Sequence, residues 1–474
     1  MRMTKIICTT GPSIEDHESL ANMMKHGLDV ARLNMSHSKR GDYEVAKSRI
    51  ALVRKVSKEL NKHVGIMLDT KGPEIRLRNF ENGEVTLREG DKFVLTVDQN
   101  VVGNQQIVAV SYLNLPKTLK AGDTVLINDG QVDLTVQKIT ETEVETKVKY
   151  GGKISNNKAV NLPDVELDMP FVSDIDREDI EFGIKHGVHY VALSFVRSAQ
   201  DVLDVREILK KHKAEHIHLI SKIENRQGVN NLAEIIEVSD GIMVARGDMG
   251  VEIPFVEVPS IQKSMIKACN EAGKYVITAT HMLESMINVP RPTRAEVSDV
   301  ANAIMDGTDC TMLSGESAAG KYPINAVATM ASINCYTENK MDYQARFGFA
   351  PLNHENQSVV ISQAVVGSAI AMDAKAIIVP TDTGRSVREI VRFRPSMPII
   401  AVCSDPNVAD QLAISWGVLS VVGKKQTNND DTIKHALEKA HSTGLVAKGD
   451  TVVLAMNSLA GNRGTTNNIR VEKI

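Results

Sequence analysis

The sequence predicts an α/β protein built on a (β/α)8 TIM barrel, with an inserted small β-barrel domain and a C-terminal α/β domain. Three observations support this fold class. Eight short apolar runs alternate with segments of helical period up to residue 341. That period disappears between residues 72 and 170, and a second strand–helix alternation begins after residue 341. With 474 residues, the chain is also too long for one ordinary core.

The barrel strands are expected at short β-branched or apolar runs. These runs cover residues 6–9, 29–34, 64–69, 190–195, 218–222, 241–245, 275–279 and 311–313. Segments with helical apolar spacing lie between them, among them residues 43–60, 202–211, 258–272 and 294–305. Eight such units favour a closed barrel over an open sheet. We therefore assign residues 1–71 and 171–341 to a catalytic barrel.

One connection between barrel strands is unusually long. Residues 72–170 contain strand-like runs at 85–95, 123–130 and 144–152. Asn128-Asp129-Gly130 and Tyr150-Gly151-Gly152 are turn signals within them. A structureless loop of about one hundred residues is not credible in a compact protein. The segment is therefore predicted to be a β-domain inserted into one loop of the barrel.

The C-terminal part reads as a doubly wound α/β domain, residues 342–474. Its strands are expected at residues 376–380, 398–402, 418–422 and 451–456, and a last apolar run covers 469–474. Polar residues, glycine and proline gather in residues 341–356. That composition suits a linker, so we place the domain boundary there.

Composition excludes several classes of protein. The net charge of −4 and a pI near 6.4 argue against nucleic acid or an anionic membrane as the main partner. The five cysteines are scattered, without a C-x-x-C pair, which is typical of reduced thiols. The N-terminus has no signal-peptide pattern, and no apolar stretch approaches the roughly 20 residues of a membrane helix. We expect a cytoplasmic protein.

Two carboxylates follow neighbouring strands of the predicted barrel. Active sites of such barrels lie at the carboxyl ends of the strands. Glu224 and Asp248 occupy that end of adjacent strands, so both could bind one divalent cation. The alternative is that each carboxylate caps a helix or forms a surface ion pair.

Lys222 precedes Glu224 by two residues, so both point to one face of an extended strand. A buried cation beside a metal suits a developing enolate or a transferring phosphoryl group. The alternative is a structural ion pair between Lys222 and Glu224.

A second set of oxygens follows the second and third strands, and its low charge suits a monovalent ion. Its members, which are also ordinary turn residues, are Asn34, Ser36, Asp69 and Thr70.

Two phosphate-like motifs lie elsewhere. Residues 315–321 have the spacing of a phosphate loop, but Tyr322 stands where a short hydroxyl must reach Mg²⁺. We therefore expect a turn there, with Pro323 opening a helix. Residues 381–386 place small hydroxyl residues and glycine before a predicted helix, which makes either a phosphate cradle or ordinary capping.

Taken together, the motifs resemble those of the pyruvate kinase family, of the bacterial type without an extra C-terminal domain. They include Asp69-Thr-Lys-Gly-Pro-Glu-Ile-Arg76 and Ser221-Lys-Ile-Glu-Asn225. Further matching strings cover residues 4–12, 31–37, 243–250, 279–286, 290–296 and 312–317, in the order of the family. The resemblance spans the whole chain.

The resemblance implies transfer of the phosphoryl group of phosphoenolpyruvate to ADP, giving pyruvate and ATP in the last step of glycolysis. Lys222 would stabilise the transferring phosphoryl group and the enolate, with Arg32 and Thr280 as further catalytic residues. The substrate would contact Arg32, Lys222, Gly247, Asp248 and Thr280. Glu224 and Asp248 would hold Mg²⁺ or Mn²⁺, and the set Asn34, Ser36, Asp69 and Thr70 would hold K⁺.

The resemblance also implies a nucleotide site, an effector site and an assembly. The nucleotide would contact Asn34, His37, Arg76 and Lys158, the last from the inserted domain acting as a lid. Glu74 accompanies K⁺ dependence in the family. A phosphorylated allosteric activator, a sugar phosphate or AMP, would bind Thr381, Thr383, Gly384, Ser386, Arg463, Gly464 and Thr465. The family also implies a homotetramer.

Four departures from the family pattern concern fine geometry. His281 replaces a usual glutamine, and Ser38, Ala159 and Asp164 replace usual glycines. Two other functions were weighed. A barrel lyase or aldolase acting on a pyruvate enolate could share the carboxylate pair but has no use for ADP. A non-catalytic sensor of phosphorylated metabolites would not need Lys222, Glu224, Asp248 and Thr280 together.

Overall fold

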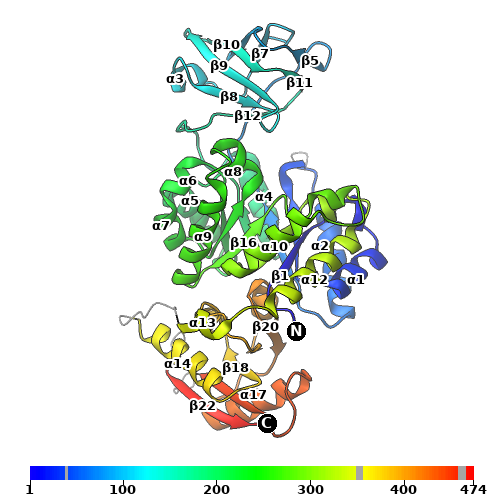
Figure 1. The fold of residues 1–474 in the computed structure, drawn as a ribbon, viewed down its shortest axis with the longest axis vertical. Helices are drawn as coiled ribbons and strands as arrows, with labels where there is room; N and C mark the ends of the chain where they lie inside the picture. The colour runs from blue at the N-terminus through cyan, green and yellow to red at the C-terminus, as the bar shows by residue number, and fades with distance from the viewer. Residues whose placement is uncertain (38–40, 349–355, 457–465) are drawn as a thin grey trace.

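The computed structural model describes residues 1–37, 41–348, 356–456 and 466–474, without the side chain of His37. Along the longest axis the inserted sheets lie at one end, the barrel in the middle and the C-terminal sheet at the other end (Figure 1). Among the described residues, none of the helices combines the length and the apolar character that crossing a membrane requires.

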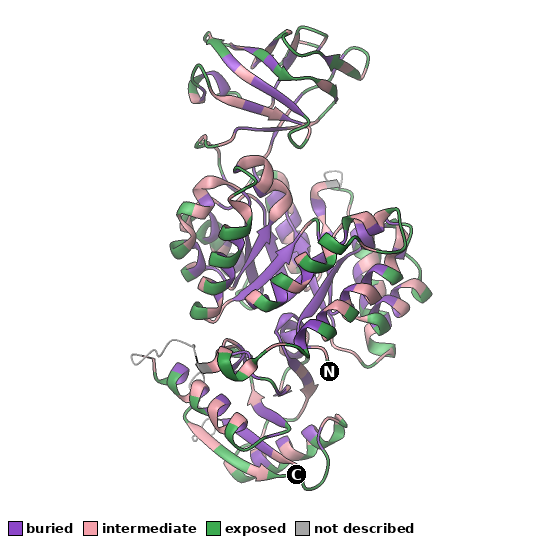
Figure 2. Cartoon of the chain, in the orientation of Figure 1, coloured by how far each residue is buried: buried purple, intermediate pink, exposed green. Residues whose placement is uncertain are grey.

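The middle body is a closed barrel of parallel strands in the order β1-β17-β16-β15-β14-β13-β3-β2. This confirms the predicted fold class. The strands are β1 (Lys5–Thr9), β2 (Val30–Asn34), β3 (Gly65–Asp69), β13 (Tyr190–Leu193), β14 (His218–Ile223), β15 (Gly241–Ala245), β16 (Tyr275–Ala279) and β17 (Cys310–Leu313). Almost every residue in them is buried, which Figure 2 shows as a continuous purple layer.

Helices surround the barrel and bury one face each against it. They are α1 (His17–His26), α2 (Glu44–Glu59), α4 (Asp174–Lys185), α5 (Ala199–Lys211), α6 (Arg226–Asn230), α7 (Leu232–Val238), α8 (Arg246–Glu252), α9 (Val258–Ala272), α10 (Arg294–Asp306), α11 (Gly315–Ala318) and α12 (Pro323–Glu338), with short 3-10 turns η1 (Pro12–Ile14), η2 (Met35–His37) and η3 (Glu284–Ile287). Pro323 opens α12, as predicted. A capping box of Thr293 and Glu296 starts α10.

The insertion between β3 and β13 forms two antiparallel-rich sheets around its own apolar core. The larger has the order β4-β12-β8-β9-β10-β6-β7, and β11 pairs with β5. The strands are β4 (Ile75–Arg76), β5 (Glu84–Leu87), β6 (Lys92–Thr96), β7 (Ile107–Ala109), β8 (Thr124–Ile127), β9 (Val132–Ile139), β10 (Glu143–Tyr150), β11 (Gly152–Ser155) and β12 (Ala159–Asn161), and a short helix α3 (Leu115–Thr118) lies among them.

The predicted turn Asn128-Asp129-Gly130 is present, and all three residues have positive φ, at 56°, 56° and 80°. Asparagine, aspartate and glycine tolerate that conformation best, so the local sequence fixes this turn. The three strand-like runs named above cover only part of the two sheets. They miss β9, which is the partner of both β8 and β10.

The C-terminal sheet has the order β20-β19-β18-β21-β22 and is parallel except for its last strand. Its strands are β18 (Ala376–Thr381), β19 (Ile399–Cys403), β20 (Val418–Val422), β21 (Thr451–Met456) and β22 (Asn468–Lys473), and its helices α14 (Gln357–Ala371), α15 (Arg385–Val391), α16 (Pro406–Gln411) and α17 (Asn429–Ser442). The predicted linker includes a helix, α13 (Tyr343–Gly348), because Tyr343 and Phe347 pack on the C-terminal core.

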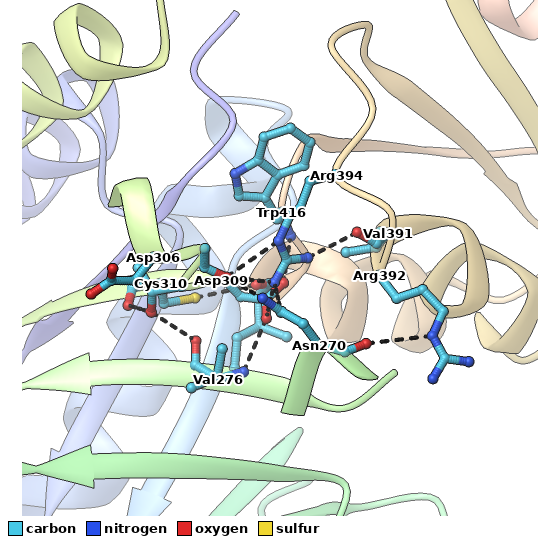
Figure 3. Close-up of polar contacts among 12 residues, drawn as sticks. Asn270, Val276, Asp306, Asp309, Cys310, Val391, Arg392, Arg394 and Trp416 are labelled. Atoms are coloured by element: carbon cyan, nitrogen blue, oxygen red, sulfur yellow. Dashed lines mark hydrogen bonds and ion pairs between the residues drawn. The ribbon is translucent and has the colours of Figure 1, made fainter. Parts of the chain in front are cut away.

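The C-terminal part also closes the floor of the barrel. Ala413 and Ile414, in the turn η4 (Leu412–Ile414), join the apolar cluster inside the barrel. Beside them, Arg394 and Asp309 form a buried ion pair at 2.9 Å (Figure 3). The amide groups of Val276 and Trp416 donate to the same carboxylate. Apolar burial and a satisfied ion pair therefore hold the two bodies together.

Candidate active site

Polar side chains gather at the carboxyl ends of the barrel strands, on the side of the inserted sheets. Because all eight strands are parallel, residues that follow different strands meet at this one end. Arg32 lies on β2, Asp69 ends β3, and Lys222 lies on β14. Strand register places Asn34 opposite Asp69. Barrel closure therefore brings together residues that lie far apart in the sequence, which the order along the chain could not decide.

The ammonium group of Lys222 lies at the centre of this cluster. It is 3.0 Å from Oε1 of Glu224 and 3.3 Å from Oδ1 of Asp69, and it donates to Oγ of Ser194 at 2.7 Å. Burial alone would lower the pKa of Lys222, but Asp69 and Glu224 outweigh burial and raise it. Lys222 is therefore a permanently charged group at physiological pH.

Arg32 is fixed by the same acidic residue. Its Nε donates to Oδ2 of Asp69 at 2.6 Å, and its Nη1 donates to the hydroxyl of Thr9 at 2.8 Å. Burial would raise the pKa of Asp69, but Arg32 and Lys222 hold it below its ordinary value. One ionised carboxylate thus orients two cations, an arrangement suited to an anionic substrate with several negative charges.

Glu224 is fully buried, and the ammonium of Lys222 lies beside it. Its Oε2 accepts the amide of Phe195 at 2.7 Å, whereas its Oε1 accepts no hydrogen bond from the described residues and only faces Lys222. Burial, helped by the negative charge of Asp248, raises the pKa of Glu224 to about 8. A buried carboxylate that has one oxygen without a hydrogen bond and lies near a second carboxylate fits a divalent cation bound by Glu224 and Asp248.

Two residues near these carboxylates have left-handed backbone conformations. Phe195 has φ of +58°, and this conformation turns its amide toward Glu224. Thr280 has φ of +62° and is followed by His281 at +54°. A β-branched residue rarely adopts such values, so the surrounding structure must hold Thr280 in place.

The clamp on Thr280 comes from the start of α8. The amide of Gly247 donates to Oγ1 of Thr280 at 2.7 Å. The guanidinium of Arg246 donates to the carbonyl of Thr280 at 2.6 Å and pairs with Asp299 at 2.7 Å. Gly247, Asp248 and Thr280, which were predicted to line one pocket, are therefore neighbours.

The set predicted to hold a monovalent ion is brought together in part. Asp69 and Thr70 are buried and both contact Ser194, and Asn34 lies beside Asp69 in the sheet. Oδ1 of Asn34 accepts the amide of Ser36 at 3.1 Å. Oxygen atoms of low total charge thus converge from β2 and β3, a donor set that fits K⁺ better than Mg²⁺.

The predicted nucleotide residues divide between two bodies. Asn34 lies on the barrel, and His37 ends η2, with its side chain outside the described residues. Arg76 ends β4, and Lys158 directly precedes β12, the strand that pairs with β4. The amide of Leu77 donates to the carbonyl of Lys158. Arg76 pairs with Glu74 at 2.6 Å and donates to the carbonyl of Asn157.

The predicted effector loop follows β18. The amide of Gly384 donates to Oγ1 of Thr381 at 2.9 Å, and Gly384 has φ of +72° just before α15. Thr383 is exposed and Ser386 lies in the first turn of α15. Arg463, Gly464 and Thr465 lie outside the described residues.

Several residues of the site were missed by the sequence reasoning. Ser194 and Phe195 follow β13 directly, so the rule that selected the other strand ends would have found them. Glu252 carries no such signal. It ends α8 and accepts a hydrogen bond from Asn161 of the insertion at 2.7 Å, a contact that only the tertiary structure makes visible.

The fold and this site define a class of enzyme: an α/β barrel with a cation-assisted site for a multiply charged anionic substrate. The family model described as pyruvate kinase, barrel domain, matches residues 1–327, and that of the pyruvate kinase alpha/beta domain matches residues 360–472. The chain belongs to the pyruvate kinase family, and is a phosphotransferase.

Individual relatives agree over the full chain. The pyruvate kinase of Clostridium acetobutylicum is 46% identical over 475 residues and covers 100% of both chains. That of Bacillus licheniformis is 45% identical, over 99% of this chain and 80% of its own length. The crystal structure of a pyruvate kinase from Cryptosporidium parvum has a TM-score of 0.94 at 40% identity and covers 100% of this chain and 96% of its own. Members of the family generally depend on Mg²⁺ and K⁺.

Proposed function

We propose that this protein transfers the phosphoryl group of phosphoenolpyruvate to ADP, giving pyruvate and ATP, at the cluster around Lys222. One observation carries the proposal beyond family membership. A buried, charged lysine lies between two carboxylates at the carboxyl end of the barrel, and a second cation, Arg32, is held by one of them. Phosphoryl transfer needs such positioned positive charge more than covalent chemistry.

Each residue has a role in this proposal. Arg32, oriented by Asp69 and Thr9, binds the phosphoryl group of the substrate. Lys222 stabilises the charge on the transferring phosphoryl group and on the enolate that it leaves. Gly247, Asp248 and Thr280, the last held by Arg246, line the pocket for the substrate carboxylate. Thr280 also belongs to the proposed route that brings a proton to the enolate carbon.

Two cations complete the site. Glu224 and Asp248 hold Mg²⁺ or Mn²⁺, and Asn34, Ser36, Asp69 and Thr70 hold K⁺. Two observations support them: Oε1 of Glu224 is buried and accepts no hydrogen bond from the described residues, and neutral oxygens lie beside Asp69. When bound, these cations supply the positive charge that phosphate and carboxylate oxygens of the substrates require.

The inserted domain acts as a lid over this site. We assign residues 1–71 and 171–341 to the catalytic barrel, 72–170 to the lid, and 342–474 to a regulatory domain, because each has a separate apolar cluster. Asn34, His37, Arg76 and Lys158 contact the nucleotide. Closing the lid over ADP excludes water, which prevents hydrolysis in place of transfer.

The first experiment measures pyruvate formation from phosphoenolpyruvate with Mg²⁺ and K⁺, with and without ADP. We expect ADP-dependent turnover that Lys222→Met abolishes. Lys5→Met is the matched control, because Lys5 is also buried but donates to Val418 at the barrel floor. Pyruvate release that does not depend on ADP would instead support a barrel lyase. An absence of turnover even with phosphorylated effectors would support a non-catalytic sensor of phosphorylated metabolites.

Dependence on K⁺ is a second test. Glu74 pairs with Arg76 at the start of the insertion. A glutamate cannot supply the positive charge that K⁺ brings to the site, so the ion itself is needed. We expect full activity with KCl and little activity with tetramethylammonium chloride at equal ionic strength. Equal rates in the two salts would contradict a K⁺ site.

Regulation and assembly are the last parts of the proposal. A phosphorylated activator binds Thr381, Thr383, Gly384 and Ser386 together with Arg463, Gly464 and Thr465, supported by the turn that Thr381 and Gly384 form. Failure of sugar phosphates and AMP to change substrate cooperativity would contradict it.

A homotetramer is supported by the exposed side chains of Phe255 and Val256, 79% and 72% accessible in the isolated chain. Light scattering measures the mass directly.

A further inference from the structure

We propose that Ser194 is a positioning residue of the phosphoryl-transfer reaction. Its hydroxyl fixes the position of the Lys222 ammonium and connects it to Asp69 and Thr70 at the end of β3. The inference rests on the proposed function of Lys222. It concerns a residue that lies directly after β13 and that none of the motifs above contains. Ser194 is 2% exposed, so its hydroxyl serves the interior of the site and not solvent.

The hydrogen bonds of the Ser194 hydroxyl have a defined direction. A serine hydroxyl has one proton to donate and lone pairs to accept with. Two acceptors lie near it, the carbonyl of Thr70 at 2.7 Å and Oδ1 of Asp69 at 3.3 Å. The closer carbonyl takes the proton. The lone pairs then remain for Lys222, whose Nζ donates to Oγ at 2.7 Å.

The Lys222 ammonium needs this contact to stay in one place. Its Nζ has three oxygen neighbours: Oγ of Ser194, to which it donates a hydrogen bond at 2.7 Å, Oε1 of Glu224 at 3.0 Å and Oδ1 of Asp69 at 3.3 Å. The two carboxylates belong to different strands and attract the ammonium from two sides, but charge attraction has little directional preference. The shortest contact is the neutral one, and a hydrogen bond does have a direction. Ser194 therefore fixes where the positive charge lies.

The backbone around Ser194 limits its movement. Gly72 has φ of +76°, and a Cβ added there would lie 2.7 Å from the carbonyl oxygen of Ser194 and 2.8 Å from its Cβ. The amide of Ser194 also donates to Oγ1 of Thr70 at 3.3 Å. The segment after β3 thus packs closely on Ser194 and restrains the backbone that carries its hydroxyl.

Four variants test the role. Ser194→Ala removes the hydroxyl, Ser194→Cys fills its space with a weak hydrogen-bonding group, and Ser194→Thr keeps the hydroxyl. Ser221→Ala is the matched control, because Ser221 is fully buried on the strand of Lys222 but bonds Ser239 on the other face. Each is measured for kcat, for KM of phosphoenolpyruvate, for exchange of the pyruvate methyl protons with deuterium, and for thermal midpoint.

We expect Ser194→Ala and Ser194→Cys to lower kcat and the exchange rate by roughly 10- to 100-fold, the loss of one hydrogen bond to a charged group. KM should change by less than about threefold, since a misplaced Lys222 charge affects the transition state more than substrate binding. Ser194→Thr should recover most of kcat if the close Gly72 backbone admits its methyl group. Ser221→Ala should keep the wild-type kcat, and its thermal midpoint should fall by a small amount similar to that of Ser194→Ala.

Three results would overturn the proposal: a Ser194→Ala kcat within twofold of wild type, wild-type kcat in Ser194→Cys, or an equal loss in Ser221→Ala. The last would mark the effect as one of buried-serine packing. If Ser194→Ala or Ser194→Thr fails to fold, Ser194→Cys against Ser221→Ala still decides. An inactive wild-type protein would instead contradict the proposed function itself, so the two failures are distinguishable.

Discussion

At the residue scale, the barrel holds two histidines away from water. Nδ1 of His189 accepts the amide of Ile66 at 2.9 Å, and its Nε2 lies 3.8 Å from Asp410. Burial lowers the pKa of His189 to about 4, against the opposing effect of Asp410, and burial lowers the pKa of His218 to about 4 as well. Both imidazoles are therefore neutral in the folded protein at pH 7.

These histidines predict acid sensitivity. In the unfolded chain a histidine has a pKa near 6.5, so between pH ~6.5 and ~4 the unfolded state binds more protons than the folded state. Stability is fully present above pH ~6.5 and is lost as pH falls toward 4, by up to roughly 3 kcal/mol for each histidine. His189→Asn keeps an acceptor for Ile66 and removes the titration.

We expect the thermal midpoint of His189→Asn to fall less steeply between pH 6.5 and 4.5 than that of the wild type. The control is His26→Asn, because His26 is exposed and bonds only within its own helix. An identical pH slope in wild type and His189→Asn would assign the acid sensitivity to other groups.

At the scale of elements, α8 connects the site to the insertion. Its first turn carries Asp248, and one turn later Glu252 accepts a hydrogen bond from Asn161 at the end of β12. Burial raises the pKa of Glu252 to about 7, with smaller contributions from Asp248 and Asp164. Arg197 holds the next part of the return segment through the carbonyls of Leu167 and Met169. Barrel side chains therefore hold the insertion at one of its two connections to the barrel, which is one hinge of the proposed lid.

Asn161→Ala should loosen that hinge. We expect KM for ADP to rise about two- to fivefold, because a lid that is less well placed closes over the nucleotide less often, while KM for phosphoenolpyruvate stays close to wild type. Asn156→Ala serves as the control, since Asn156 bonds Phe80 inside the insertion and does not reach the barrel. Equal changes in both KM values would indicate a general loss of structure.

At the scale of the whole molecule, one buried ion pair joins the barrel to the C-terminal sheet. Arg394 donates to Asp309, to the carbonyl of Gly307 and to Asn270, and its guanidinium lies 5.6 Å from the ring centre of Trp416 (Figure 3). Arg394 belongs to the segment after α15, which begins at the proposed effector loop. A change in that loop could thus reach the barrel floor through a short, rigid connection.

Arg394→Met should cost about 3 to 5 kcal/mol of unfolding free energy, because Asp309 would remain buried without its partner. Adding Asp309→Asn should recover part of that loss. Denaturant unfolding followed by the fluorescence of Trp416, the single tryptophan of the chain, measures both. Lys153→Met, which breaks the exposed pair with Glu84, should cost less than about 1 kcal/mol. A comparable loss there would show that burial is not the cause.

The sequence by itself determined the barrel strands, the insertion, the C-terminal α/β sheet and the set of polar residues at the strand ends. It could do so because apolar periodicity and turn residues act locally, and because parallel strands always present their carboxyl ends together. It missed β9 and placed a linker where Tyr343 and Phe347 bury a helix, since short strands and tertiary packing leave weak local signals.

Only the tertiary structure decided which groups touch. Lys222 donates a hydrogen bond to Ser194, and Glu252 accepts one from Asn161. The first contact depends on how neighbouring barrel strands pair, and the second on how the insertion lies against the barrel. The pKa of Glu224 likewise follows from burial and from Asp248, which no spacing along the chain contains. Hydrogen bonds and buried charges act over a few ångströms in space, so their partners become fixed only when the chain has folded.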